Sequence, residues 1–161
     1  DGRTLYVLAV NGGPVKNHNR QSVVEHRMQA GDFIVSVNGA EGSSTTLAEL
    51  IKTERKLLMR IKHPEKINVL VDVTNTKGVL GLEWGEPCSG NALLIAGVEE
   101  GAVAKWNRES NCRCRAVQAG DRVIAVNGQR GAASELLAQM AAPRFQMTVA
   151  RPAGEHDWVQ V

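Results

Sequence analysis

The stretch QAGDFIVSVNGAEG (Gln29–Gly42) decides the fold, because nearly the same residues recur as QAGDRVIAVNGQRG (Gln118–Gly131). Each copy contains an apolar strand followed by an Asn-Gly pair, which is the strongest short signal of a β-hairpin. Repetition of such a phrase within one chain predicts two copies of the same structural unit.

Each copy begins with a Gly-Asp pair, whose aspartate we expect to hydrogen-bond the backbone of a turn. These aspartates are Asp32 and Asp121. The strands that follow, Phe33–Val37 and Arg122–Val126, are apolar almost throughout, as expected when both faces of a strand are covered.

The similarity continues on both sides of the repeated phrase. Upstream, LYVLAVNGGPV (Leu5–Val15) aligns with LLIAGVEEGAV (Leu93–Val103). Downstream, LLMRIKHP (Leu57–Pro64) aligns with FQMTVARP (Phe145–Pro152), and we expect each of these strands to end at its proline. Helical periodicity in TTLAELIK and SELLAQM predicts a short helix in each unit, with these apolar faces: Leu47, Leu50 and Ile51 in the first, and Leu136, Leu137 and Met140 in the second.

The two units differ at their beginnings. The second has the segments INVLVDV (Ile67–Val73) and TKGVLGLEW (Thr76–Trp84) before its Leu93 strand, whereas four residues precede Leu5. We therefore expect a first domain at residues 1–66 that lacks its N-terminal strands, a second at 67–152, and a tail at 153–161. Upstream sequence, a partner or the tail could complete the first domain. Because the chain begins without Met, we also expect a processed product or a fragment.

These features together resemble the PDZ family. GDFIVSVNG and GDRVIAVNG are similar to its Gly-Asp strand and Asn-Gly turn, and VLGLEW is similar to its carboxylate-binding loop, with Val79 in place of the usual first glycine. The resemblance implies an α+β fold of two PDZ-like, partly open β-barrels or sandwiches, each with about five to six strands and two short helices. AVAKWN (Ala102–Asn107) and the long loop after it are similar to PDZ-like units of some algal proteins.

The resemblance implies a non-enzymatic scaffold that binds protein C-termini or extended segments as an added strand. Ala133 stands where many family members have a histidine, so an apolar residue is favoured two positions before the ligand's terminus. The peptide-binding residues that the resemblance implies in the second domain are Lys77, Leu80, Gly81, Leu82, Ala133, Leu137 and Met140. In the first domain Ser44, Ala48 and Ile51 would face an incomplete groove, where conventional binding is not expected.

Two other interpretations stay open for the chain as a whole. One is a structural accessory subunit of a larger assembly, membrane-bound and photosynthetic if the algal resemblance holds, and the other is a regulatory segment of a protease. The tail, which ends Trp158-Val159-Gln160-Val161, could be a ligand for its own or a neighbouring groove, a strand donated to the first domain, the start of a third repeat, or disordered.

The composition of the chain argues against several classes of function. The net charge of +2 gives no strong field for nucleic acid, and no apolar run approaches the ~20 residues of a membrane span. Three cysteines, an odd number, argue against a disulfide framework. Pro87–Asn91 is the nearest approach to a nucleophile motif, and it lacks a catalytic context, so no enzyme, cofactor or metal site is expected. We expect a soluble protein, cytoplasmic or organellar (a plastid included), or peripheral to a membrane complex.

Overall fold

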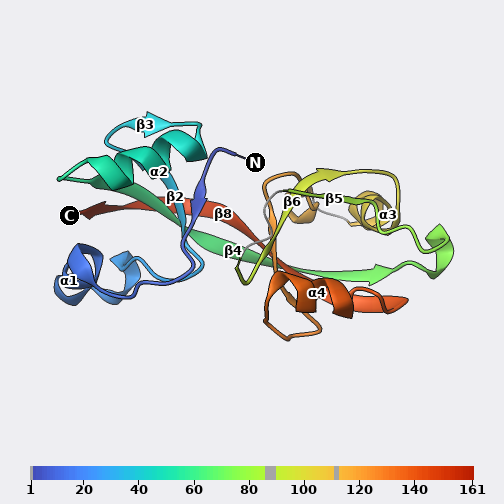
Figure 1. Ribbon diagram of the computed structural model, residues 1–161. Coiled ribbons are helices and arrows are strands. Elements are labelled where there is room, and N and C mark those ends of the chain that lie inside the picture. The colour runs from blue at the N-terminus through green and yellow to red at the C-terminus, as the bar shows by residue number, and fades with distance from the viewer. Residues whose placement is uncertain (1, 86–89, 111–112) are drawn as a thin grey trace. The chain divides into compact units, whose positions relative to one another are not determined.

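The computed structural model describes residues 2–85, 90–110 and 113–161, and divides them into two compact units (Figure 1). The N-terminal unit comprises Gly2–Glu65 with Pro152–Val161, and the C-terminal unit comprises Lys66–Arg151. Each combines antiparallel strands with helices, so the predicted α+β class is confirmed.

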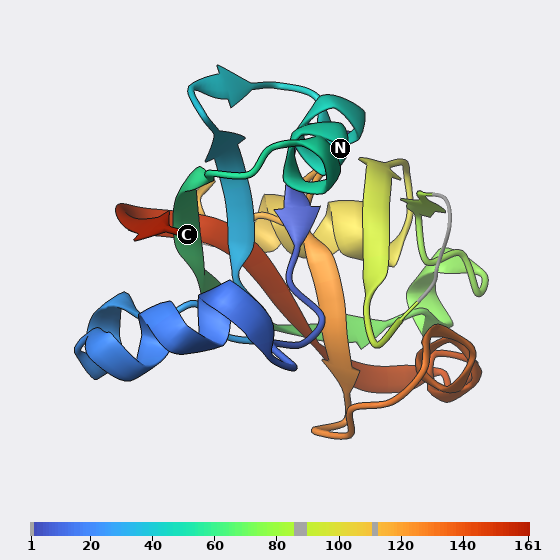
Figure 2. The ribbon, with the colours of Figure 1, turned by 60° about the vertical axis from the view of Figure 1, so that its left-hand side comes forward.

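In the N-terminal unit the strands follow the order β1-β2-β4-β8, and β3 pairs with the end of β2, where Val37 lies opposite Ala40. Figure 2 shows β1 beside β2, where Leu5 is paired with Ile34. The elements are β1 (Leu5–Tyr6), α1 (Gly13–Gln21), η1 (Val24–His26), β2 (Phe33–Val37), β3 (Ala40–Glu41), α2 (Ser44–Thr53), the first part of β4 (Leu58–Asp72) and the last part of β8 (Arg144–Gln160).

In the C-terminal unit the order is β4-β8-β7-β6-β5, which leaves β5 at an edge of the sheet. Its remaining elements are η2 (Thr74–Thr76), β5 (Leu82–Trp84), β6 (Leu93–Val98), α3 (Ala102–Glu109), η3 (Arg113–Arg115), β7 (Arg122–Val126) and α4 (Ala133–Gln139). The same succession of strand, helix, strand and helix occurs in both units, as the repeat predicts.

The repeated phrase forms the predicted structure in both places. Strands Phe33–Val37 and Arg122–Val126 have the predicted bounds. Asn38 and Asn127 adopt left-handed backbone conformations, with φ of 50° and 52°, as the hairpin requires. The hairpin prediction is therefore confirmed.

The two long strands correct one prediction. β4 and β8 do not end at Pro64 and Pro152 but continue to Asp72 and Gln160. Both prolines lie next to the residue at which the strand passes from one compact unit into the other. The pairing of β4 with β2 reaches only Lys62, and the pairing of β8 with β7 reaches only Ala150. Each proline therefore lies beyond the end of one of its strand's two ladders, where a missing N–H is tolerated.

The tail is the last part of β8 and packs with the N-terminal unit. The Val161 N–H donates to the Leu57 C=O (2.9 Å), and the Leu57 N–H donates to the Val161 C=O (2.6 Å). The expected alternation is present, because Val159 is fully buried while Trp158 and Gln160 are exposed. Of the four interpretations of the tail, the structure shows the strand donated to the first unit.

Each unit has an apolar core of its own, assembled mainly from aliphatic side chains. That of the C-terminal unit includes Leu93, Ile95, Val103, Val123, Leu136, Phe145 and Met147. That of the N-terminal unit includes Val7, Met28, Ile34, Leu47, Met59, Ile61 and Val159.

A buried aspartate closes the turn before the central strand of each unit. The Gln29 N–H donates to Asp32 Oδ2 (2.7 Å), and the Gln118 N–H donates to Asp121 Oδ2 (3.0 Å), which confirms the role predicted for both aspartates. In the C-terminal unit Arg151 donates to both carboxylate oxygens of Asp121, at 3.0 and 2.6 Å. The negative charge of the buried Asp121 is therefore paired.

Replacing Arg151 by Ala should lower the free energy of unfolding by about 3–5 kcal/mol, because it leaves the Asp121 carboxylate buried without its cation. Urea denaturation followed by circular dichroism measures the change. Arg144→Ala is the matched control, since Arg144 pairs with Asp72 at an exposed position, and it should change stability little. Equal effects of the two substitutions would contradict the assignment.

Candidate functional site

The edge strand β5 and the loop before it form the candidate site of the C-terminal unit. The loop follows η2 and turns through Lys77, whose backbone is left-handed (φ 53°) and whose side chain is exposed. Asp72 starts this turn by accepting a hydrogen bond from the Thr74 N–H (2.9 Å). The loop then continues through Leu80 and Gly81 into β5.

Three successive carbonyls of the loop point toward the start of α3. The Ala102 N–H donates to the Val79 C=O (3.0 Å), and the Val103 N–H donates to the Leu80 C=O (3.1 Å). The Glu99 N–H donates to the Gly81 C=O (3.0 Å). The first N–H groups of a helix have no partner within the helix, and here the loop supplies partners for two of them.

This orientation of the carbonyls fixes the direction of the loop N–H groups. In a planar trans peptide the C=O of one residue and the N–H of the next point in opposite directions. The N–H groups of Leu80, Gly81 and Leu82 therefore point away from α3. Those of Leu80 and Gly81 donate no hydrogen bond to any described residue. Consecutive N–H groups that face one side form a concavity suited to an anion.

Gly81 is required by contact with the chain's own backbone. Its φ is +77°, and a Cβ at this position would lie 2.6 Å from the Glu99 carbonyl oxygen and 3.0 Å from the Gly101 backbone. A Cβ on Gly101 would in turn lie 2.7 Å from the Gly81 nitrogen. The two glycines thus let the loop approach α3 closely enough for the three hydrogen bonds to form.

The apolar residues of the predicted site divide into two groups. Ala133 is a buried member of the core cluster of the C-terminal unit, and Leu80, Leu82 and Met140 are half-buried against the same cluster. Leu137, in contrast, is 40% exposed on α4. The structure therefore brings residues from both sides of the predicted groove together on one core cluster and leaves Leu137 accessible.

The outer edge of β5 is open within the described part of the chain. β5 pairs with β6 through Leu82 opposite Val98 and Glu83 opposite Gly97. Because the Gly81 C=O accepts from Glu99, the residue that follows β6, the alternation of an antiparallel ladder directs the backbone groups of Leu82 outward. This edge can accept one further strand.

A polar cluster in the N-terminal unit was missed by the sequence analysis. His63 Nδ1 lies 2.8 Å from Asp32 Oδ1, and His63 Nε2 lies 3.0 Å from Asp157 Oδ2 and 2.9 Å from the Glu25 carbonyl oxygen. His26 Nδ1 also contacts Asp157, at 2.5 Å. Alignment of RIKHP with TVARP offered one signal, because it places His63 where the second unit has Arg151.

Both nitrogens of His63 face hydrogen-bond acceptors, so the cluster favours the doubly protonated imidazolium. Burial by itself lowers the pKa of His63, but the hydrogen bond and charge of Asp32, the Glu25 carbonyl and Asp157 together raise that pKa above its ordinary value. The N-terminal unit thus holds its buried aspartate with a titratable cation, whereas the C-terminal unit uses an arginine.

Among the described residues, no group of His, Cys, Asp and Glu side chains is arranged to hold a metal ion. None of the helices in the described ranges is long and apolar enough to cross a membrane. Cys114 is disulfide-bonded, a bond that the sequence analysis did not predict. Pro87, Cys88 and Ser89, from the suspected nucleophile motif, lie outside the described residues, as does Cys112.

Comparison with known proteins adds no identification: no protein-family model matches the chain, and no curated protein matches its sequence. What the site binds must therefore follow from its own geometry.

The stability of the N-terminal unit should fall as the pH rises through the folded-state pKa of His63. Because that pKa is raised on folding, the stabilisation is complete below the unfolded value of about 6.5 and is lost above the folded value. Urea unfolding of the full chain from pH 5.5 to 8.5 measures this slope. His63→Arg, which copies Arg151, should flatten the slope, whereas His156→Arg, at an exposed histidine, should leave it intact. An unchanged slope in His63→Arg would refute this role.

Proposed function

We propose that the C-terminal unit is a PDZ-like peptide-binding module, which takes the C-terminus of a partner protein as an added strand on β5. The observation that carries the proposal is the engagement of the Val79, Leu80 and Gly81 carbonyls by Glu99 and the start of α3. It turns three N–H groups toward the place where a terminal carboxylate would lie. Hydrogen bonds to a charged group are about twice as strong as those between neutral groups.

The apolar surface next to these N–H groups selects the ligand's side chains. Leu80, Leu82 and Met140 pack on one cluster and would surround the terminal side chain. Ala133 offers no hydrogen-bond partner to a hydroxyl group, so an apolar residue two positions before the terminus binds better than Ser or Thr. A peptide that ends Val-x-Val with a free carboxylate fits both requirements.

The exposed residues complete the proposed site. Lys77 is exposed beside the loop and adds positive charge near the carboxylate. Leu137 would contact the residue two positions before the terminus. In this function the unit performs no chemistry; it holds an extended segment through backbone hydrogen bonds and apolar contacts.

Amidation of the terminal carboxylate should weaken binding of a Val-x-Val peptide to the full chain by roughly tenfold or more, because charged hydrogen bonds of about 1.5–3 kcal/mol are lost. Isothermal titration calorimetry with the free acid and the amide measures the difference. Equal affinities for the two peptides would refute the carboxylate site.

Leu137→Glu should weaken binding of the free-acid peptide several-fold or more, because it places a negative charge beside an apolar contact and near a carboxylate. Leu70→Glu is the matched control, since Leu70 is a 71% exposed leucine of the same unit and lies on β4 rather than on β5 or α4. The control should bind as the unmodified chain does. A loss of equal size in both variants would argue against a groove between β5 and α4.

A further inference from the structure

The backbone contacts of the two units fix which residues correspond to each other. In the N-terminal unit the Val7 N–H donates to the Asp32 C=O (2.9 Å), and in the C-terminal unit the Ile95 N–H donates to the Asp121 C=O (2.9 Å). Since Asp32 and Asp121 are the same position of the repeated phrase, Val7 corresponds to Ile95. The residues that follow each of them correspond as well.

The corresponding segments differ in their hydrogen bonding. Ala96–Val98 is the part of β6 that adjoins β5, with Val98 opposite Leu82 and Gly97 opposite Glu83. Its counterpart, Leu8–Val10, makes no hydrogen bond with any described residue. The N-terminal unit therefore has an open backbone edge at the position where the C-terminal unit carries β5.

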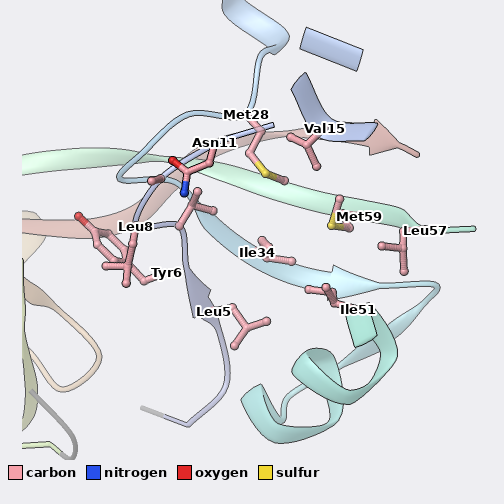
Figure 3. A pocket seen from close by; sticks show the side chains of 12 residues that line it. Leu5, Tyr6, Leu8, Asn11, Val15, Met28, Ile34, Ile51, Leu57 and Met59 are labelled. Atoms are coloured by element: carbon pink, nitrogen blue, oxygen red, sulfur yellow. The ribbon is translucent and has the colours of Figure 1, made fainter. Parts of the chain in front are cut away.

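An apolar pocket of about 470 Å³ opens beside this edge (Figure 3). Figure 3 shows Leu5 of β1, Ile34 of β2, Ile51 of α2, Met59 of β4 and the adjacent Leu57 around it, and Val7 also lines it.

The corresponding surface of the C-terminal unit is covered. Leu93 and Ile95 correspond to Leu5 and Val7, and they belong to the cluster on which the half-buried Leu80, Leu82 and Trp84 pack. The pocket thus lies on a surface whose counterpart is filled by the side chains of β5 and its preceding loop.

We propose that this pocket binds an extended apolar segment of a partner polypeptide. The segment adds as an antiparallel strand to Leu8–Val10 and inserts bulky apolar side chains at alternate positions, as Leu80, Leu82 and Trp84 are spaced. Burial of apolar surface drives the binding, at about 25 cal/mol per Å² removed from water, and the ladder hydrogen bonds set its register.

The charge of α1 and the pairing of β5 with β6 indicate what kind of polypeptide occupies the pocket. Helix α1 contributes Val15 to the pocket and carries Lys16 and Arg20 but no acidic residue, so an acidic residue between the apolar ones is favoured, as Glu83 is in β5. A second copy of this chain would have to withdraw its own β5 from β6 and from its core. This cost disfavours a second copy, and the occupant that we propose is a free segment of this pattern on another polypeptide.

Titration of the ¹⁵N-labelled full chain with a synthetic peptide of sequence KGVLGLEW, that of Lys77–Trp84, tests the proposal. The amides of Leu8–Val10 should become protected from exchange with solvent by tenfold or more, and the methyl signals of Met28 and Met59 should shift. The control peptide has serine at the positions of Leu80, Leu82 and Trp84 and should change none of these signals. Equal effects of the two peptides, or effects confined to residues 80–84, would overturn the proposal.

Two substitutions, one in the pocket and one outside it, distinguish binding in the pocket from nonspecific binding of the peptide. Leu8→Glu, at a pocket residue that is 56% exposed, should weaken binding of KGVLGLEW at least tenfold, while Val24→Glu, at a 67% exposed valine of the same unit, should leave it unchanged. Circular dichroism of each variant checks that it is folded. Equal binding by both variants would exclude the pocket.

Fusing the peptide sequence to the chain tests the same site and does not require the free peptide to bind with high affinity. Val161 is hydrogen-bonded to Leu57, the counterpart of Phe145, whereas Val73 is bonded to Pro143, two residues before Phe145. Val161 therefore corresponds to Val71, so the sequence of Asp72–Trp84 is fused after Val161. The fusion should protect the amides of Leu8–Val10 and raise the urea midpoint of the N-terminal unit. The same fusion with serine at the three apolar positions should do neither. Failure of both the peptide and the fusion to protect these amides would overturn the proposal.

Discussion

The contact between the start of α3 and the loop before β5 is the constraint on which the functional interpretation depends. Two N–H groups that a helix leaves without partners, those of Ala102 and Val103, hold the carbonyls of Val79 and Leu80, and the planarity of the peptide then directs the following N–H groups outward. The contact forms because Gly81 and Gly101 leave no Cβ between the two backbones. A loop turned the other way would present carbonyl oxygens, which repel a carboxylate.

A second constraint is that the buried aspartate of the repeated phrase needs a cationic partner, and the two units supply different ones. Asp121 is paired with Arg151, whose charge is permanent, whereas Asp32 is paired with His63, whose charge depends on pH. His63 also contacts Asp157 of β8. The ion pair of the N-terminal unit therefore also links the tail strand to the turn before β2.

Much of the fold could be predicted from the sequence, because the repeat shows the sequence pattern of each shared strand and helix twice. The hairpin strands and both aspartate turns follow from local patterns. The continuation of β4 and β8 through their prolines could not be predicted, since the effect of a proline depends on whether its N–H would stand inside a ladder. The contact of His63 with Asp157 joins residues far apart in the sequence and left no local pattern.

The site was predictable in part. Leu80, Leu82, Ala133 and Met140 lie on one apolar cluster, whereas the exposure of Leu137 depends on the rotation of α4, which helical periodicity does not fix. The most direct test of the account is the chemical shifts of the Leu80, Gly81 and Leu82 amide protons while a peptide with a free C-terminal Val is added to the ¹⁵N-labelled chain. The account predicts downfield shifts of these three protons, because each becomes a donor to a carboxylate or to the peptide backbone. Unchanged signals in the presence of bound peptide would contradict it.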